Sequence, residues 1–260
     1  MSEHWRRAPL YVRGGGRAIL QQPFDTDRFE RLRASLDQDG ADGVRARGGE
    51  VVFVEAIDRA DPALRKAAQA HARLFGLPSA WFDAVRTHAD SGIGSHFDHS
   101  DNFVLQQEGR KTWRLSPPDQ LPEGARARRM LGDETVGSAA VDPGSAVEFA
   151  LEPGDLLYLP LFWVHEGVSL GPSLSLSLVC PAITVRALFL RSLEAEMART
   201  GLGWTPAPAC PAPAREQADR LQRASALLLK RLSEPEAVQN MARDQIRFLQ
   251  PSDDFTSNQP

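Results

Sequence analysis

The feature that most constrains the fold is the stretch from Trp81 to Pro181, where short apolar runs alternate with turns rich in glycine, proline and aspartate. The 3.6-residue periodicity of helices is absent from it, whereas residues 173–178 alternate strictly between serine and leucine. Such alternation is typical of a strand with one polar and one apolar face. We therefore predict a β-barrel core over residues 81–181, with the serine face toward an internal cavity. Strands are expected at 81–88, 95–98, 102–107, 111–115, 146–151, 155–159, 164–168 and 173–180.

Helical patterns flank this core. Residues 25–38 and 61–74 are predicted helices, the second opened by Asp61 as cap and Pro62 at its first position, and a short strand is expected at 51–54. After Pro181 we expect helices at 185–199, 214–232 and 234–249. The last carries an apolar stripe that must pack on the barrel or on a second subunit, formed by Val238, Met241, Ala242, Ile246 and Leu249.

The length of 260 residues fits one catalytic domain, predicted at 1–183, and a helical region at 184–260 that forms a homodimer. The net charge of −4 gives no general attraction to nucleic acid or to anionic membranes, so direct nucleic-acid binding is not expected. The polar N-terminus lacks the apolar core of a signal peptide, and no run reaches membrane-spanning length. We expect a cytoplasmic protein without membrane contact.

Three residues predict a metal site. In an extended segment, residues i and i+2 project to one side, so His96 and Asp98 can bind one metal ion while Phe97 faces away. His165 lies in a later apolar run, which a closed barrel brings to the same place. Two histidines and one carboxylate hold ferrous iron on one face of its octahedron and leave three positions open. The set indicates an oxygenase.

Neighbouring residues compete with this ligand set. His99 and Asp101 are also metal-ligand types, and we interpret them as solvated turn residues. The stretch 119–144, with few apolar residues, is too long for a tight turn and is predicted to be a substrate-facing surface loop near the barrel mouth. Its arginines 126, 128 and 129 are interpreted as solvated.

Two ordered motifs carry a family resemblance. The first runs from Gly92 to Pro118 (GIGSHFDHSDNFVLQQEGRKTWRLSPP), and the second is EPGDLLYLP at 152–160 followed by His165-Glu166-Gly167. They resemble the JmjC and cupin-like iron and 2-oxoglutarate oxygenases, most closely the ribosomal-protein (arginine/histidine) hydroxylases. The resemblance covers roughly residues 75–183, and two motifs in order are far more specific than a lone His-x-Asp.

This resemblance implies a mainly β fold with α elements, a double-stranded β-helix (jelly-roll) barrel. It implies Fe(II), 2-oxoglutarate and O2 as cofactor and co-substrates, with His96, Asp98 and His165 as iron ligands. It makes Lys111 the counter-ion of the distal carboxylate of 2-oxoglutarate, because an unpaired charge buried in a barrel is very costly. Asn102 matches a cofactor-site asparagine of the asparaginyl hydroxylase acting on hypoxia-inducible factor. A further donor to that carboxylate is expected from the serine face, at Ser173, Ser175 or Ser177.

The leading hypothesis is a 2-oxoglutarate-dependent hydroxylase of a protein or peptide side chain. An alternative is a tailoring hydroxylase of an amino acid or natural-product intermediate, and N-demethylation is the same chemistry on another carbon. A cupin that binds metal or ligand without turnover is the alternative from another class.

Overall fold

The computed structural model describes residues 3–38, 44–47, 50–200 and 214–249. The chain divides into two compact units, Met1–Ala182 and Ile183–Pro260. None of the described helices is both long enough and apolar enough to cross a bilayer.

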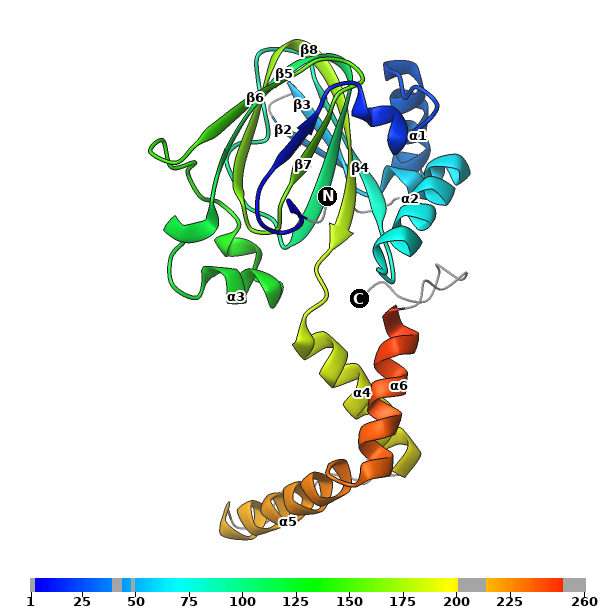
Figure 1. The fold of residues 1–260 in the computed structure, drawn as a ribbon, viewed down its shortest axis with the longest axis vertical. Helices are drawn as coiled ribbons and strands as arrows, with labels where there is room; N and C mark the ends of the chain where they lie inside the picture. The colour runs from blue at the N-terminus through cyan, green and yellow to red at the C-terminus, as the bar shows by residue number, and fades with distance from the viewer. Residues whose placement is uncertain (1–2, 39–43, 48–49, 201–213, 250–260) are drawn as a thin grey trace. The chain divides into compact units, whose positions relative to one another are not determined.

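The elements follow one another along the chain (Figure 1). The strands are β1 (Leu10–Val12), β2 (Val44–Arg47), β3 (Val51–Val54), β4 (Trp81–Thr87), β5 (Ser100–Ser116), β6 (Val147–Leu151), β7 (Leu156–Leu159) and β8 (Val164–Pro181). The α-helices are α1 (Thr26–Gln38), α2 (Pro62–Phe75), α3 (Ala125–Met130), α4 (Val185–Thr200), α5 (Ala214–Leu232) and α6 (Pro235–Leu249). The described residues also form the 3-10 turns η1 (Gly15–Ala18), η2 (Ile57–Ala60), η3 (Pro118–Gln120) and η4 (Glu134–Val136).

The first unit is built on one antiparallel sheet that curves into a barrel (Figure 1). Its strand order is β1-β7-β5-β8-β4-β3-β2, and β6 pairs with β5 outside this path. The inward faces are filled by a core that includes Val104, Trp113, Leu115, Leu157 and Leu159. The predicted mainly β fold with flanking helices is confirmed.

Strands β5 and β8 hold the barrel together because they pair along almost their whole lengths. The segments predicted as 102–107 and 111–115 are one strand, as are those predicted as 164–168 and 173–180. The ladder shifts register between Gln106 and Arg110, where β5 bends. Gly109 has φ +66, and a Cβ there would lie 2.1 Å from the carbonyl oxygen of Pro172, so only glycine fits this close approach.

One predicted strand is wrong. Residues 95–98 form no strand, and His96 makes only isolated bridges, to Ser138 and His165. The segment is a loop at one end of the barrel, and only one of its residues, His96, pairs with the neighbouring segments. It is nevertheless extended enough for the predicted alternation, since Phe97 is buried on the opposite side, among Ala125, Val141 and Val164.

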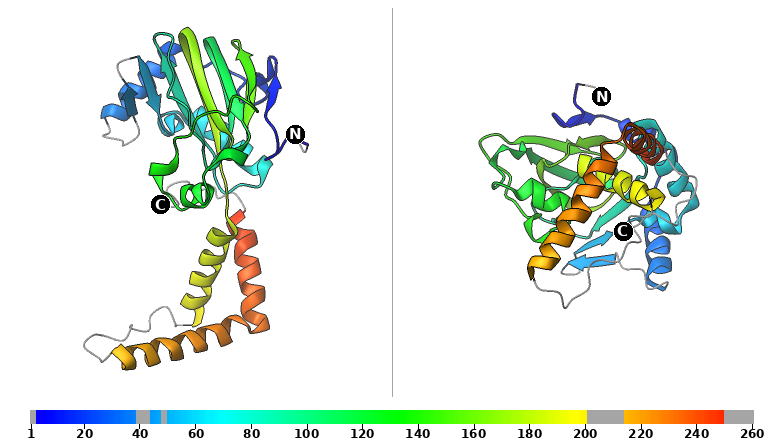
Figure 2. Two further views of the ribbon diagram at one scale, coloured as in Figure 1. Left: turned by 90° about the vertical axis from the view of Figure 1, so that its left-hand side faces the viewer. Right: turned by 90° about the horizontal axis from the view of Figure 1, so that it is seen from below.

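Helices α1 and α2 flank the β2–β4 side of the sheet (Figures 1 and 2). Helix α2 begins as predicted, because the Asp61 carboxylate accepts hydrogen bonds from the backbone N–H groups of Ala63 and Leu64, at 2.9 and 3.1 Å. It ends at Gly76, which caps it at φ +64.

The second unit contains α4, α5 and α6. Helices α4 and α6 pack together, and the Ser192 hydroxyl on α4 donates to the Met241 carbonyl on α6 at 3.3 Å. Glu196, 2% exposed, accepts two hydrogen bonds from Arg199, which also pairs with Asp244. Of the predicted apolar stripe, Met241 is half-buried and Val238 is 50% exposed; the side chains of Ile246 and Leu249 lie outside the described part.

Candidate metal centre and cavity

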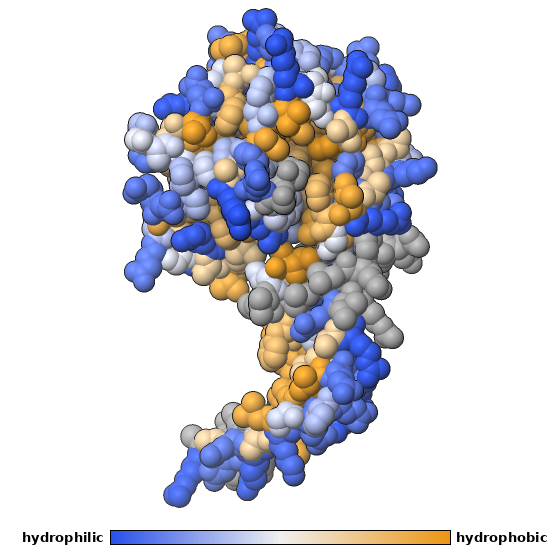
Figure 3. Space-filling model, viewed as in Figure 1, coloured by the Kyte–Doolittle hydropathy of each residue, from blue (hydrophilic) through white to orange (hydrophobic). Residues whose placement is uncertain are grey.

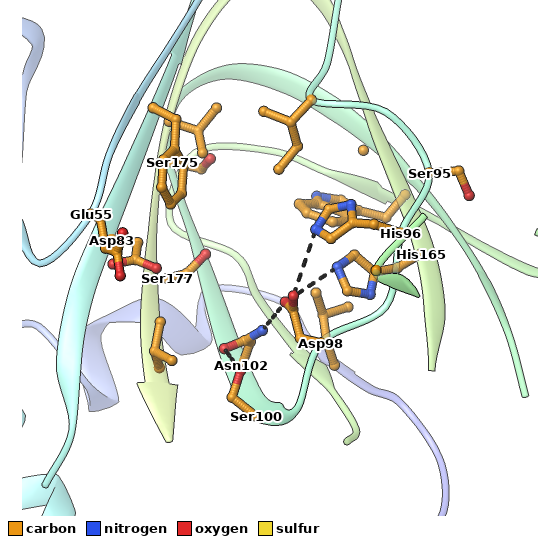
Figure 4. A pocket seen from close by; sticks show the side chains of 18 of the residues that line it. Glu55, Asp83, Ser95, His96, Asp98, Ser100, Asn102, His165, Ser175 and Ser177 are labelled. Atoms are coloured by element: carbon orange, nitrogen blue, oxygen red, sulfur yellow. Dashed lines mark hydrogen bonds and ion pairs between the residues drawn. The ribbon is translucent and has the colours of Figure 1, made fainter. Parts of the chain in front are cut away.

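Three potential metal ligands meet at one end of the barrel (Figure 4). His96 and Asp98 come from the loop at residues 95–98, and His165 is the second residue of β8. Reciprocal backbone hydrogen bonds join the two histidines, from His96 N to His165 O at 3.0 Å and from His165 N to His96 O at 2.8 Å. This bridge fixes the two ligand-bearing segments side by side.

Backbone carbonyls orient both imidazoles. The Nδ1–H of His96 donates to the carbonyl oxygen of Gly94 at 2.9 Å, and the Nδ1–H of His165 donates to that of Trp163 at 2.8 Å. With Nδ1 protonated, the lone pair of each ring lies on Nε2, which faces Asp98. Burial and the neighbouring His96 lower the pKa of His165 to about 4, so this ring is neutral at pH 7, as a metal ligand must be.

The Asp98 carboxylate completes the set. Its Oδ1 lies 3.9 Å from His96 Nε2, and its Oδ2 lies 3.7 Å from His165 Nε2. Burial acts to raise the pKa of Asp98, but its electrostatic interactions with His165, His96 and Arg129 outweigh burial and hold the pKa below its ordinary value. One ligand atom from each of the three residues lies within 4.8 Å of the others, and two imidazoles with one carboxylate suit a divalent iron ion.

Asn102, at the start of β5, lies beside this set. Its Nδ2 donates to Asp98 Oδ2 at 2.8 Å, and its Oδ1 accepts from the Ser100 hydroxyl at 3.2 Å. The structure therefore brings Asn102 to the metal ligands, where it orients the Asp98 carboxylate.

The triad opens into a cavity of about 370 Å³ (Figure 4). Lys111 lies in its wall and is 3% exposed. Its Nζ donates to the Ser175 hydroxyl at 3.3 Å and lies 5.7 Å from the centre of the Trp113 ring. Burial lowers the pKa of Lys111 to about 8. A buried ammonium with one neutral hydroxyl partner is a place for an anionic group.

The serine face of β8 divides between two roles. Ser175 and Ser177 line the cavity as predicted for that face. Ser173 instead lies in a buried hydroxyl cluster with Thr87 and Ser169, at 2.8 and 2.7 Å. These three hydroxyls satisfy one another away from the cavity lining.

The sequence did not lead us to predict two carboxylates in the wall of the cavity, Asp83 and Glu55. Asp83 on β4 pairs in register with Ser177, and Glu55 lies next to it (Figure 4). Among the described residues, Asp83 accepts one hydrogen bond, from the N–H of Ala56 at 2.8 Å. Burial, with smaller contributions from Glu55 and other carboxylates, raises the pKa of Asp83 well above its ordinary value. The signal was present, because Asp83 shares one face of the strand with Trp81 and Val85, and the residues at 81, 82, 84 and 85 around it are all apolar.

The predicted loop 119–144 contains α3 and contributes to the cavity. Arg126 and Arg128 are exposed, as expected. The expectation for Arg129 is wrong, since its side chain is 12% exposed and lies in the cavity wall, with Nη2 4.0 Å from Asp98 Oδ1. Position 137 is glycine, and a Cβ there would lie 3.3 Å from Arg129 Cζ, so the guanidinium packs on bare backbone.

The interpretation of Asp101 as a solvated turn residue is also wrong, because it is 0% exposed and paired with Arg6. His99 lines the cavity and is half-buried. Neither lies within the group of three that can share a metal ion. The competing ligands are thereby separated from His96, Asp98 and His165.

Comparison with known proteins gives one family match and several relatives. Residues 77–188 match the family model of the JmjC domain. Over 92 residues the chain is 35% identical to the bifunctional lysine-specific demethylase and histidyl-hydroxylase NO66 of Drosophila persimilis, covering 35% of this chain and 12% of that protein. Over 98 residues it is 34% identical to the ribosomal protein uL16 3-hydroxylase of Escherichia coli strain K12, covering 37% of this chain and 24% of that protein. The chain therefore spans less than a quarter of the length of these two relatives.

Solved structures share the fold. An X-ray structure of Escherichia coli YcfD has a TM-score of 0.60 and 20% identity, covering 94% of this chain and 70% of that one. The ribosomal oxygenase YcfD in complex with cobalt and 2-oxoglutarate has a TM-score of 0.59 and 18% identity, covering 94% and 68%. At these identities the likeness establishes the fold.

Proposed function

We propose that this chain is an Fe(II)- and 2-oxoglutarate-dependent oxygenase that hydroxylates a protein or peptide side chain, because its residues 77–188 match the family model of the JmjC domain. The observation that carries the proposal is the convergence of His96, Asp98 and His165 at the end of a cavity whose wall also holds the buried Lys111. Supporting it, a fold neighbour is described in complex with cobalt and 2-oxoglutarate, and one relative is named as a hydroxylase of a ribosomal protein.

When bound, ferrous iron with 2-oxoglutarate and dioxygen supplies the oxidation: decarboxylation of the keto acid to succinate, coupled to hydroxylation of a C–H bond. The chain supplies binding and orientation. His96, Asp98 and His165 hold the metal from one side, and Asn102 fixes the Asp98 carboxylate. Lys111 and Ser175 receive the distal carboxylate of the co-substrate and so set the direction in which its keto-acid end points.

The remaining wall of the cavity indicates the kind of side chain that enters. Asp83 is a half-buried carboxylate that accepts one hydrogen bond from a backbone N–H, and Glu55 adds a second carboxylate beside it. A carboxylate that is partly removed from water is stabilised by a cation or by several hydrogen-bond donors. We therefore propose that the substrate presents a basic side chain, with Asp83 and Ser177 as its partners.

The test is a panel of short peptides bearing arginine, histidine or lysine, with glutamine and free amino acids for comparison. We expect one basic peptide to stimulate succinate formation and to gain one oxygen atom by mass spectrometry. Stimulation by a free amino acid alone would instead favour the tailoring hydroxylase, and failure of the wild-type chain to form succinate at all would favour a binding cupin.

Replacing Asp83 by asparagine should reduce peptide-stimulated turnover about tenfold, because the amide keeps the shape but loses the charge that pairs with a cation. Substrate-independent succinate formation should change less than twofold, since Asp83 lies on a different strand from Lys111 and the metal ligands. Steady-state assays of both activities in Asp83→Asn and in the exposed control Asp90→Asn give the comparison. Equal losses of both activities in Asp83→Asn would contradict the substrate role.

We also propose that the helical region 184–260 forms a homodimer while residues 1–183 form the catalytic domain. Large apolar side chains are exposed on each of the three helices described in the second unit, and Figure 3 shows apolar groups on its visible face. They are Phe189, Leu190, Leu227, Leu229 and Val238, from 37% to 67% exposed. Several large apolar side chains exposed on one unit are typical of a surface that contacts another protein.

Light scattering should give the mass of two chains at micromolar concentration, and Leu229→Glu together with Val238→Glu should shift it toward one chain. A single-chain mass for the wild-type protein would contradict the dimer. The cytoplasmic location stays a prediction.

A further inference from the structure

We propose that Arg6 is a positioning residue for the metal centre and acts on it through Asp101 and the turn at residues 160–163. The inference rests on the proposed function in one respect, the binding of a divalent metal by His96, Asp98 and His165. It assigns a role to the segment 4–9, the N-terminal strap, which is far from the triad in sequence.

The strap is anchored by one aromatic ring. Backbone N–H groups of Arg7 and Ala8 donate to the His4 carbonyl, which folds the strap into a turn. The Trp5 ring stacks on Phe75, Phe103 and Tyr158 at centroid distances of 5.4, 6.3 and 5.6 Å. This packing holds the backbone of the next residue, Arg6, against the barrel.

The Arg6 side chain, 38% exposed, joins a hydrogen-bond network around the buried residues Asp101 and Tyr158. Its Nε donates to Asp101 Oδ2 at 2.9 Å, and its backbone N–H donates to the Tyr158 hydroxyl at 2.8 Å. The Tyr158 hydroxyl in turn donates to Asp101 Oδ1 at 2.7 Å. Asp101 is 0% exposed, so Arg6 is the cation that balances a fully buried carboxylate.

The same carboxylate holds the turn that leads to His165. Asp101 Oδ1 also accepts from the backbone N–H of Leu161 at 3.1 Å. One residue on, the N–H of Phe162 donates to the backbone carbonyl of Asp98 at 3.1 Å. The carbonyl of Trp163 then accepts the Nδ1–H of His165. The turn thus makes one contact with each of two metal ligands.

Backbone strain marks this network. Among the described residues, three non-glycine residues have positive φ, and two of them are Arg6 at 56° and Phe162 at 65°. Such conformations persist only where surrounding contacts enforce them, and they gather at functional sites. The contacts that enforce them here are those of Asp101 and Tyr158. Loss of the Arg6 side chain would leave the Asp101 charge without its cation and would loosen the turn, and with it the orientation of Asp98 and His165.

The test uses Co(II) as the metal probe and the full chain. Arg6→Met should bind Co(II) about tenfold more weakly than the wild type in an absorption titration, the size of effect typical of a partner beyond the ligands themselves. Arg7→Met is the matched control, since Arg7 is the next residue of the strap, is also exposed and forms no ion pair with the described residues. It should bind within twofold of the wild type.

Thermal unfolding of the metal-free proteins separates positioning from stability. A purely structural contribution would lower the unfolding temperature of Arg6→Met but leave the Co(II) affinity of the folded protein unchanged, and that result would overturn the inference. If Arg6→Met does not fold, Tyr158→Phe removes one hydroxyl while keeping the ring and the Arg6–Asp101 pair. A roughly threefold weaker affinity in Tyr158→Phe supports the network and an unchanged one overturns it. No Co(II) binding by the wild-type chain would overturn the metal centre itself, and this inference with it.

Discussion

Replacing Asp98 with alanine is expected to lower succinate formation from 2-oxoglutarate at least about 100-fold and to abolish tight binding of a divalent metal. Asp98 supplies the only carboxylate of the three grouped ligands in the described part of the chain, and each of its oxygens faces one histidine. Loss of a metal ligand lowers metal affinity and activity more than loss of a residue that hydrogen-bonds to a ligand. The latter change typically lowers either quantity by about 10- to 100-fold. Two neutral imidazoles alone bind ferrous iron weakly.

The measurement pairs isothermal titration with Co(II) and an assay for succinate. His165→Ala should behave in the same way, and the matched control is His88→Ala, because His88 is an exposed histidine that follows β4. Turnover within tenfold of the wild type in Asp98→Ala would show that the metal is held by other residues.

The grouping of His96 with Asp98 could be predicted because it depends on local spacing. The i, i+2 spacing of His96 and Asp98 places both on one side of any extended segment, whether or not that segment pairs as a strand. For this reason the metal prediction did not depend on the strand expected at 95–98, which is wrong. The third residue, His165, was added to the set through the family resemblance, which rests on the order of the two motifs.

The single strands β5 and β8 could not be predicted from local pattern. Turn-like residues at Gly109 and Gly171 suggested breaks, but both residues lie inside continuous strands that bend. The bend depends on the contact between Gly109 and Pro172 on the neighbouring strand, which the sequence around either residue does not reveal.

The interpretations of Asp101 and Arg129 failed for a related reason. Both residues lie in polar stretches and would be solvated if local composition decided burial. Asp101 is buried because Arg6 and Tyr158, distant in sequence, provide its partners. Only 12% of the Arg129 side chain is exposed, because it packs against the backbone of Gly137 beside Asp98. Such burial is a property of the assembled fold.

Replacing Lys111 with methionine is expected to weaken 2-oxoglutarate binding about 100-fold while Co(II) affinity stays within twofold of the wild type. Lys111 is 3% exposed, and its Nζ has the Ser175 hydroxyl as hydrogen-bond partner. Without the ammonium, the distal carboxylate of the co-substrate would be buried beside neutral groups, and breaking one side of a buried charge pair typically costs about 2–5 kcal/mol. The matched control is Arg110→Met, because Arg110 is the preceding residue of β5 and is exposed in an ion pair with Glu152.

The pH dependence of binding separates this charge role from simple packing. Burial lowers the pKa of Lys111 to about 8 in the empty cavity, and a bound carboxylate favours the protonated amine and so raises that pKa. Binding therefore takes up a proton above pH 8: affinity is constant at lower pH and falls by up to about tenfold per unit above it. Anaerobic titration of the Co(II)-loaded protein between pH 7 and 9.5 should show this fall in the wild type and in Arg110→Met, but not in Lys111→Met. A pH-independent wild-type affinity would place the distal carboxylate away from Lys111 and leave the buried ammonium without a ligand.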